Sequence, residues 1–300
     1  MALNPNETPA KMATSQTQQQ AGLTRGSIEV NGADRVYYLH LPAGYDGKTP
    51  LPLILAFHGG GGKPEMLNKL THLNALADKE KVILVYPGGL NKHWNDGRGV
   101  GEQNVDDVGF IAALLKQLEK DHPIDNQRIY ATGISNGGFF SQYLAIKMPG
   151  KLAAIASVAA SVGKPIYEKE TPPQPTPILF ILGGKDPLVP FDGGEIRIGM
   201  LRRGFVVSAK DAAAYWAKAN HCSAPPVVTA GTATDGETVT TTTFKSAAGG
   251  ADVVQIALSN GGHAWPGGWQ YLPPRLIGKT STAIQATDVI WDFFKDHQLR

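Results

Sequence analysis

The sequence predicts a doubly wound α/β fold, in which helices cover both faces of a mostly parallel β-sheet. Short apolar runs alternate with longer segments of helical periodicity. The runs are apolar throughout, as in strands that are buried on both faces of a parallel sheet. The alternation continues to the end of the chain without an internal repeat or a linker, so we expect one α/β domain over residues 25–300.

The expected elements follow from this pattern. The predicted strands of the sheet are residues 53–57, 82–86, 129–133, 153–158, 178–182 and 253–258, and an antiparallel pair, 27–30 and 36–41, precedes them. Helices are expected over 66–79, 108–118, 209–219 and 283–295. Asp106 and Asp107 suit the start of the second helix, where carboxylates meet unpaired N–H groups. The Thr-rich run 238–243 predicts an exposed strand near the sheet edge.

Composition excludes several classes of function. The 300 residues carry a formal net charge of +2 without a cluster of Lys and Arg, so we expect no nucleic-acid partner. The sequence contains no run of 18 apolar residues, so we expect no membrane span. The single cysteine, Cys222, cannot form an intramolecular disulfide. Residues 1–24 predict a disordered tail without a secretory signal. The compartment stays open: the protein is secreted if a native signal was trimmed off, and otherwise cytoplasmic. The oligomeric state also stays open.

The strongest chemical signal is the G-x-S-x-G motif at residues 133–137, between the strand 129–133 and a helical segment. This context is typical of the α/β-hydrolase fold, where a tight turn exposes the serine at the edge of the sheet. We therefore predict Ser135 as the nucleophile. The backbone N–H of Asn136, at the helix start, is expected to face the negative charge that develops during acyl transfer. The alternative is a purely structural turn.

A serine nucleophile needs a base and an orienting carboxylate. His263 follows the last predicted strand on the glycine-rich loop 260–268, and we predict that it is the base. Asp186 follows the strand 178–182 and is the preferred carboxylate, with Asp192 as the alternative. The order Ser135, Asp186, His263 is that of the α/β-hydrolase fold.

The glycine run 59–62 follows the strand 53–57 and His58. Glycines allow backbone N–H groups to approach a substrate, so we expect this loop to supply further oxyanion donors, with a flexible turn as the alternative. The run lacks the Gly-Lys-Ser/Thr ending of a phosphate-binding loop. His58 is expected to orient this loop. No metal-ligand spacing occurs among the histidines, so we expect neither a metal nor a cofactor.

These motifs occur together with Tyr86-Pro87-Gly88-Gly89, Trp94-Asn95-Asp96-Gly97-Arg98 and the segment 105–110. The set resembles the polyhydroxybutyrate-depolymerase-type (LpqC-like) esterases, which are related to the feruloyl and acetylxylan esterases of carbohydrate esterase family 1. The resemblance covers residues 27–298. It implies Ser135 as nucleophile, Asp186 as acid, His263 as base, and backbone donors from Asn136 and from Gly59 or Gly60.

We therefore expect a serine carboxylesterase that acts on a small or polymeric ester through an acyl-enzyme. Trp94 and Trp265, with Trp269 and Tyr271, fall on loops around the catalytic edge, where we expect exposed aromatic side chains to stack on the substrate; the alternative is that some of them only pack the loop. The segment 191–207 is expected to form part of a lid or rim. Its arginines are expected to be solvated, with contact to a carboxylated substrate as the alternative. A feruloyl, aryl or short acyl ester is the preferred substrate. The alternatives are a polyhydroxyalkanoate depolymerase and a non-catalytic binding protein on the same scaffold.

Overall fold

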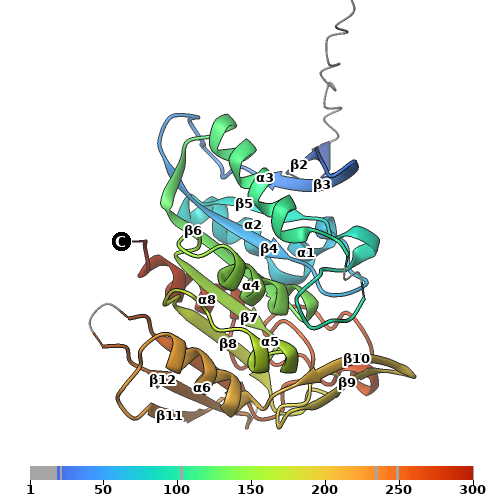
Figure 1. Ribbon diagram of the computed structural model, residues 1–300, viewed down its shortest axis with the longest axis vertical. Helices are drawn as coiled ribbons and strands as arrows, with labels where there is room; N and C mark the ends of the chain where they lie inside the picture. Colours follow the sequence, from blue (N-terminus) through green and yellow to red (C-terminus); the bar gives the residue numbers. More distant parts are fainter. Residues whose placement is uncertain (1–18, 21, 102–103, 234–235, 248–249, 300) are drawn as a thin grey trace, which may run out of the picture.

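A computed structural model describes residues 19–20, 22–101, 104–233, 236–247 and 250–299 (Figure 1). The described strands are β1 (Gln19–Gln20), β2 (Leu23–Val30), β3 (Ala33–His40), β4 (Leu51–Phe57), β5 (Ile83–Pro87), β6 (Ile124–Ile134), β7 (Ala154–Val158), β8 (Ile178–Gly183), β9 (Gly194–Ile198), β10 (Leu201–Val206), β11 (Val227–Thr232), β12 (Thr238–Phe244) and β13 (Val253–Leu258). The described helices are α1 (Pro64–Thr71), α2 (Leu73–Glu80), α3 (Asp107–Asp121), α4 (Asn136–Lys147), α5 (Lys164–Lys169), α6 (Ala209–Ala219), α7 (Pro274–Ile277) and α8 (Ala286–Lys295), with a 3₁₀ turn at Leu90–Lys92.

The described strands form an 11-stranded sheet in the order β1-β2-β3-β5-β4-β6-β7-β8-β13-β12-β11. The six central strands, β5-β4-β6-β7-β8-β13 in sheet order, are all parallel, and antiparallel strands extend the sheet at both edges. All six predicted apolar runs are central strands. This arrangement confirms the predicted mostly parallel sheet, and it brings the carboxyl ends of the central strands to one edge.

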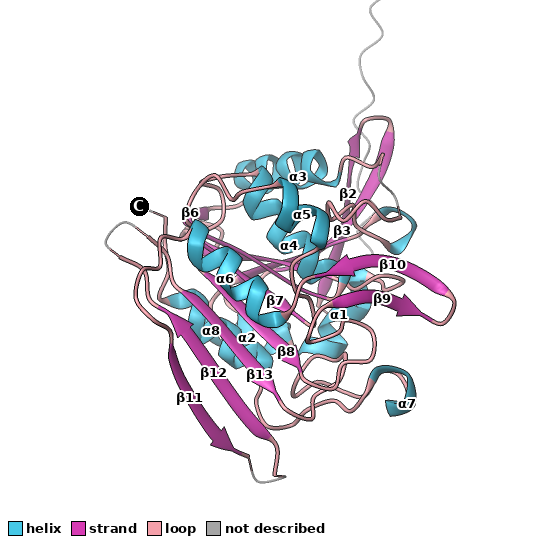
Figure 2. Ribbon diagram, turned by 60° about the horizontal axis from the view of Figure 1, so that its bottom comes forward, coloured by secondary structure: helices cyan, strands magenta, loops and turns pink. Residues whose placement is uncertain are grey.

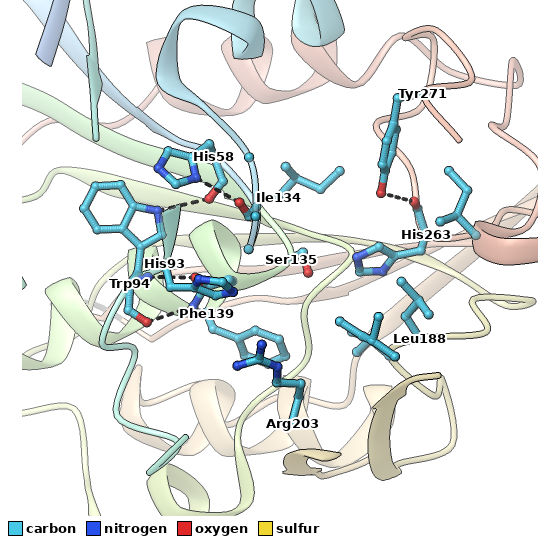
Figure 3. Close-up of a pocket in the computed structure, with 18 of the residues that line it drawn as sticks. His58, His93, Trp94, Ile134, Ser135, Phe139, Leu188, Arg203, His263 and Tyr271 are labelled. Carbon is cyan, nitrogen blue, oxygen red and sulfur yellow. Dashed lines mark hydrogen bonds between the residues drawn. The ribbon is translucent and has the colours of Figure 1, made fainter. Parts of the chain in front are cut away.

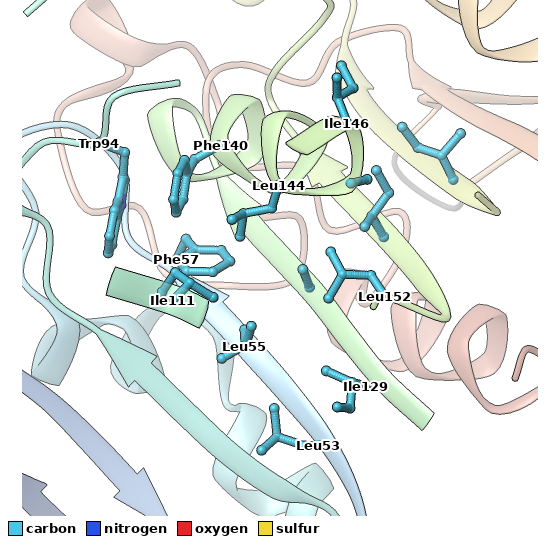
Figure 4. Packing of buried hydrophobic residues seen from close by; sticks show 14 of the residues in the cluster. Leu53, Leu55, Phe57, Trp94, Ile111, Ile129, Phe140, Leu144, Ile146 and Leu152 are labelled. Atoms are coloured by element: carbon cyan, nitrogen blue, oxygen red, sulfur yellow. The ribbon is translucent and has the colours of Figure 1, made fainter. Parts of the chain in front are cut away.

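Helices cover both faces of the sheet (Figure 2). Side chains of α3, α4 and α6 belong to one buried apolar cluster, and side chains of α1, α2 and α8 belong to the other. Figure 4 shows the first cluster, where Phe57 and Leu55 of β4 pack against Phe140 and Leu144 of α4. The predicted doubly wound architecture is therefore present.

The predicted antiparallel pair is also confirmed. β2 and β3 pair from Thr24 opposite Leu39 to Val30 opposite Ala33. Their connection is Asn31-Gly32, and both residues have positive φ, as the tightest hairpin turns require. Most of the predicted tail, residues 1–24, lies outside the described residues, namely residues 1–18 and residue 21. Its last part differs from the prediction, because β2 begins at Leu23, which is buried in the core.

The predicted helix 66–79 is wrong in one respect, because it is divided into α1 and α2 at His72. This residue has a left-handed conformation with φ 58°. The Thr71 hydroxyl donates to the carbonyl of Leu67 at 3.0 Å, and the Asn68 side chain accepts the N–H of Asn74 at 3.0 Å. Side chains thus take the place of helical backbone hydrogen bonds at the break.

The segment 191–207 contains an element that the sequence pattern did not predict as strands. β9 and β10 form a separate two-stranded antiparallel sheet (Figure 2). This β9–β10 hairpin lies beside the carboxyl edge of the main sheet, where it contributes three side chains to the pocket described below. None of the described helices combines the length and the apolar character that crossing a bilayer requires.

Candidate active site

Ser135 lies on a sharp turn between the end of β6 and the start of α4. Its backbone has φ 56° and ψ −122°, a region that residues with side chains rarely adopt. A side chain at Gly137 would collide with the carbonyl oxygen of Phe57, and one at Gly133 would collide with the backbone of Gly137. The two motif glycines therefore allow the turn to pack against the end of β4, and the turn presents Ser135 above the sheet.

His58 holds the glycine loop in place beside Ser135. The N–H of Gly89 donates to Nε2 of His58 at 3.0 Å, and Nδ1 lies 2.8 Å from the carbonyl oxygen of Gly59. Because that carbonyl can only accept, the proton is on Nδ1 and the ring is neutral. Burial lowers the pKa of His58 to about 4, which agrees with this assignment. His58 thus has the orienting position that the sequence predicted, with no nitrogen left to act as a base.

Asp186 and His263 form a buried pair. Oδ2 of Asp186 lies 2.8 Å from Nδ1 of His263, and the two side chains are 3% and 4% exposed. Oδ1 of Asp186 accepts the N–H groups of Leu188 and Val189, both at 2.8 Å. The rival carboxylate, Asp192, is exposed. The structure therefore pairs His263 with Asp186, and Nε2 of the ring remains available on the other side.

Ser135 and His263 line the same pocket, a cavity of about 470 Å³ (Figure 3). In the figure, the imidazole of His263 and the Ser135 side chain face one another across it. No hydrogen bond joins these two side chains in the described part of the chain, although such contacts are often loose without substrate. Among the residues described, no three His, Cys, Asp or Glu side chains are placed to hold a metal ion.

The predicted oxyanion donors lie against Ser135. A side chain at Gly59 would meet Cβ of Ser135 at 3.5 Å, and one at Gly60 would meet Cβ of Asn136 at 3.7 Å. Asn136 is the first residue of α4, so its N–H has no partner within the helix. The N–H of Gly60 donates to no other described residue. The region between Gly60 and Asn136 can therefore hold a negatively charged oxygen.

The Asn136 side chain has a role that the sequence reasoning missed. Its amide oxygen accepts the N–H of Trp94 at 2.8 Å, and its amide nitrogen donates to the Trp94 carbonyl at 3.0 Å and to Asp96 at 2.6 Å. Arg98 donates to the same Asp96 carboxylate at 2.6 Å. This network fixes the start of α4 against the loop 94–98. The one sequence signal for this network is that the loop 94–98 and the serine motif occur together.

The prediction of exposed aromatic side chains at Trp94 and Trp265 is wrong, because each is 1% exposed. Trp94 stacks on Phe140 with ring centroids 4.8 Å apart, so only part of it reaches the pocket wall. Trp265 packs in the core and donates to Thr287 at 3.0 Å. Trp269, which is 52% exposed, and Tyr271 line the pocket instead. The pattern placed the loops correctly but could not tell which ring turns inward.

Several proteins with assigned names are similar to this chain in sequence. The family model "Esterase PHB depolymerase" matches residues 35–165. A relative from Nocardia uniformis subsp. tsuyamanensis, named "Putative esterase NocK", is 31% identical over 91% of this chain and 83% of its own length. Feruloyl esterase C of Emericella nidulans is 33% identical over 59% of this chain, which spans 63% of that enzyme. Feruloyl esterase B of Piromyces equi is 27% identical, and the chain spans 42% of it.

Among solved structures, the acetyl xylan esterase from Aspergillus awamori superimposes with a TM-score of 0.61 over 90% of this chain and 98% of its own, at 12% identity. A thermostable esterase superimposes with a TM-score of 0.58 over 92% of this chain and 63% of its own, at 13% identity. These likenesses show the fold, which is the α/β-hydrolase fold. The sequence matches show more: the chain belongs to the esterase PHB depolymerase family.

Proposed function

We propose that this protein is a serine carboxylesterase that hydrolyses feruloyl, other aryl or short acyl esters through an acyl-enzyme intermediate. The observation that carries the proposal is the buried Asp186–His263 pair, whose ring faces Ser135 across an apolar pocket. A serine hydroxyl becomes a nucleophile when a neighbouring imidazole removes its proton. We assign Ser135 as nucleophile, His263 as base and Asp186 as the residue that orients the base.

In the first half-reaction, Nε2 of His263 takes the Ser135 proton while Oγ bonds to the ester carbonyl carbon. The carbonyl oxygen becomes an oxyanion, for which the N–H groups of Gly60 and Asn136, with Gly59 as the further candidate, are the proposed donors. The tetrahedral species collapses when the C–O bond to the alcohol breaks. His263 returns the proton to the departing oxygen, and the acyl group remains on Ser135.

In the second half-reaction, His263 takes a proton from water as the water oxygen attacks the acyl carbon. The bond to Ser135 then breaks, and His263 returns the proton to Oγ as the acid leaves. The Asp186 carboxylate accepts a hydrogen bond from Nδ1–H throughout, which stabilises the imidazolium that forms in both halves.

The pocket walls support an apolar acyl or alcohol group. Leu67 and Leu70 of α1 line the pocket, together with Phe139, Leu188 and Val189. Burial of an aromatic ring or a short alkyl chain against such walls is favourable by about 25 cal/mol per Å². The names of the feruloyl and acetyl xylan esterase relatives suggest the same substrate class.

A polyester depolymerase is the second candidate, and one specific observation favours it. Large apolar side chains around the pocket mouth are exposed, among them Trp269, Ile198 and Leu272 at 52%, 49% and 44%. Exposed apolar side chains gathered around a pocket commonly mark a surface that binds another apolar surface. A polymer chain would extend from the pocket across this rim.

The test is hydrolysis of p-nitrophenyl acetate, butyrate and octanoate, methyl ferulate and polyhydroxybutyrate film, with the wild type beside Ser135→Ala. We expect the wild type to cleave at least one soluble ester and the variant to lose about 10⁴-fold or more in kcat. Preference for the film over all soluble esters would select the second candidate. If the folded wild type is inert on every substrate, the esterase assignment for this chain fails, and a binding function on the same scaffold becomes the alternative.

A further inference from the structure

The charged side chains that line the pocket are all basic. Apart from the histidines, they are Lys63, Arg98 and Arg203, and no Asp or Glu is among the described lining residues. Asp186 lies behind His263 rather than in the wall. A concave site whose walls carry one sign of charge attracts ligands of the opposite sign.

The three basic residues are not equivalent. Arg98 is bound to Asp96 at 2.6 Å, and its guanidinium stacks over the Phe139 ring at 3.9 Å. Its charge is therefore neutralised within the wall. Lys63 is exposed at the start of α1. Arg203 is half-buried, and its guanidinium has neither an ion pair nor a hydrogen bond to any residue that the structure describes.

The two faces of the β9–β10 hairpin carry different charged side chains. On the face away from the pocket, Glu195 pairs with Arg197 at 2.5 Å and with Arg202 at 3.4 Å. On the other face, Ile196 and Arg203 line the pocket. Two arginines that are adjacent in sequence thus have different surroundings, one paired with a carboxylate and the other directed to the cavity.

An irregularity in β10 occurs at this position. The register shifts between Arg202, which lies opposite Arg197, and Phe205, which lies opposite Glu195, so Arg203 and Gly204 together face the single residue Ile196. Gly204 has φ 82°, a conformation that glycine adopts readily. Bulges re-aim side chains, and here the backbone is held as well, because Arg98 donates to the Arg203 carbonyl at 3.2 Å. In Figure 3 the Arg203 guanidinium points into the pocket below Ser135.

We propose that Arg203 is an anion anchor, so that the preferred substrates are esters that carry a carboxylate away from the scissile bond. This inference rests on the proposed esterase function and narrows its substrate class. The apolar walls hold the chain or ring of the substrate, Ser135 attacks its ester carbonyl, and the Arg203 fork binds the distal carboxylate through two parallel N–H···O contacts. Half-esters of dicarboxylic acids and oligomers of hydroxy acids with a free end have this chemistry.

The test compares charged and neutral esters of matched shape. For the acyl side, the pairs are the monomethyl and dimethyl esters of succinate, adipate and suberate, which also locate the anchor by chain length. For the alcohol side, the pair is 4-acetoxybenzoate and its methyl ester. The variants are Arg203→Met, Arg203→Lys and, as the matched control, Arg202→Met, which removes a neighbouring arginine that lies outside the pocket.

We expect Arg203→Met to lower kcat/KM by about tenfold or more on the charged member of at least one pair, and by less than about threefold on its neutral partner. Arg203→Lys should retain part of the preference for the charged ester, because lysine keeps the positive charge but lacks the paired N–H groups of the guanidinium. Arg202→Met should change neither member by more than about threefold. Raising the ionic strength from about 0.05 to 0.5 M should reduce the wild-type preference, because an incompletely buried ion pair is screened.

Equal effects of Arg203→Met on both members of every pair would overturn the anchor, as would an equal effect of Arg202→Met. In either case, the neutral esters still report whether the protein is an esterase. A folded wild type that cleaves no ester, charged or neutral, would instead mean that the proposed function has failed.

Discussion

Nδ1 of His263 donates a hydrogen bond to Oδ2 of Asp186 across 2.8 Å, and both side chains are almost completely buried. Because the carboxylate only accepts, the bond holds the proton on Nδ1 and leaves Nε2 free toward the pocket. The second oxygen of Asp186 is occupied by the N–H groups of Leu188 and Val189. The geometry therefore selects one imidazole tautomer before any substrate binds.

The first prediction concerns this selection. In Asp186→Asn, the amide can donate to Nδ1 and stabilise the wrong tautomer, so we expect kcat to fall by about 10³–10⁴ with little change in the fold. The exposed Asp192→Asn is the control and should retain full activity. Steady-state kinetics on p-nitrophenyl butyrate, with circular dichroism for the fold, are the measurements. A loss of less than tenfold in Asp186→Asn would remove Asp186 from the proposed mechanism.

The second prediction concerns the backbone of Ser135, whose φ of 56° and ψ of −122° cost about 1–3 kcal/mol for a residue with a side chain. Ser135→Ala keeps this strain, whereas Ser135→Gly relieves it at some cost in unfolded-chain entropy. We expect both variants to be inactive and the glycine variant to be the more stable by about 1 kcal/mol. Urea unfolding measures the difference. Equal stability of the two variants would mean that the strain relieved by glycine is no larger than its entropy cost, which contradicts this prediction.

The third prediction concerns the packing of Gly137 against the end of β4. A methyl group at Gly137 would collide with the carbonyl oxygen of Phe57, so Gly137→Ala must move the turn. We expect a loss of about 3 kcal/mol in unfolding free energy and loss of activity. Gly231, in the exposed edge strand β11, has open space around it, and Gly231→Ala should be neutral or stabilising by about 0.5 kcal/mol. Near-normal stability of Gly137→Ala would contradict the close approach.

The fourth prediction is a pH dependence. Burial lowers the pKa of His58 from 6.5 to about 4 in the folded protein. At a pH between these two pKa values, His58 binds a proton in the unfolded chain but not in the folded protein. The free energy of unfolding therefore falls as the pH drops from about 6.5 to 4. The full effect is about 3 kcal/mol.

The measurement is urea unfolding at several pH values, with the wild type beside His58→Gln. The glutamine oxygen can still accept the N–H of Gly89, but the side chain does not titrate in this range. We expect the variant to be less stable at pH 7 and to approach the wild type as the pH falls to 4. Parallel pH profiles of the two proteins would show that His58 is not the group responsible.

Much of the fold could be predicted because its signals are local. A strand buried on both faces must be apolar throughout, and the runs that became β4, β5, β6, β7, β8 and β13 satisfy this condition without reference to the rest of the chain. The Asn31-Gly32 turn follows from the ability of these two residues to adopt positive φ. The break at His72 was missed, because it depends on side-chain hydrogen bonds that apolar periodicity does not reveal.

The sequence by itself determined the candidate residues Ser135, Asp186 and His263, because each follows a buried strand, and the carboxyl ends of parallel strands meet at one edge of the sheet. Only the tertiary structure decided which side chains turn inward or outward on the loops, as the burial of Trp94 and Trp265 shows. It also decided that Arg203 faces the pocket while Arg202 pairs with Glu195. The physical reason is that loop side chains are oriented by contacts between segments far apart in the chain, and no local pattern encodes those contacts.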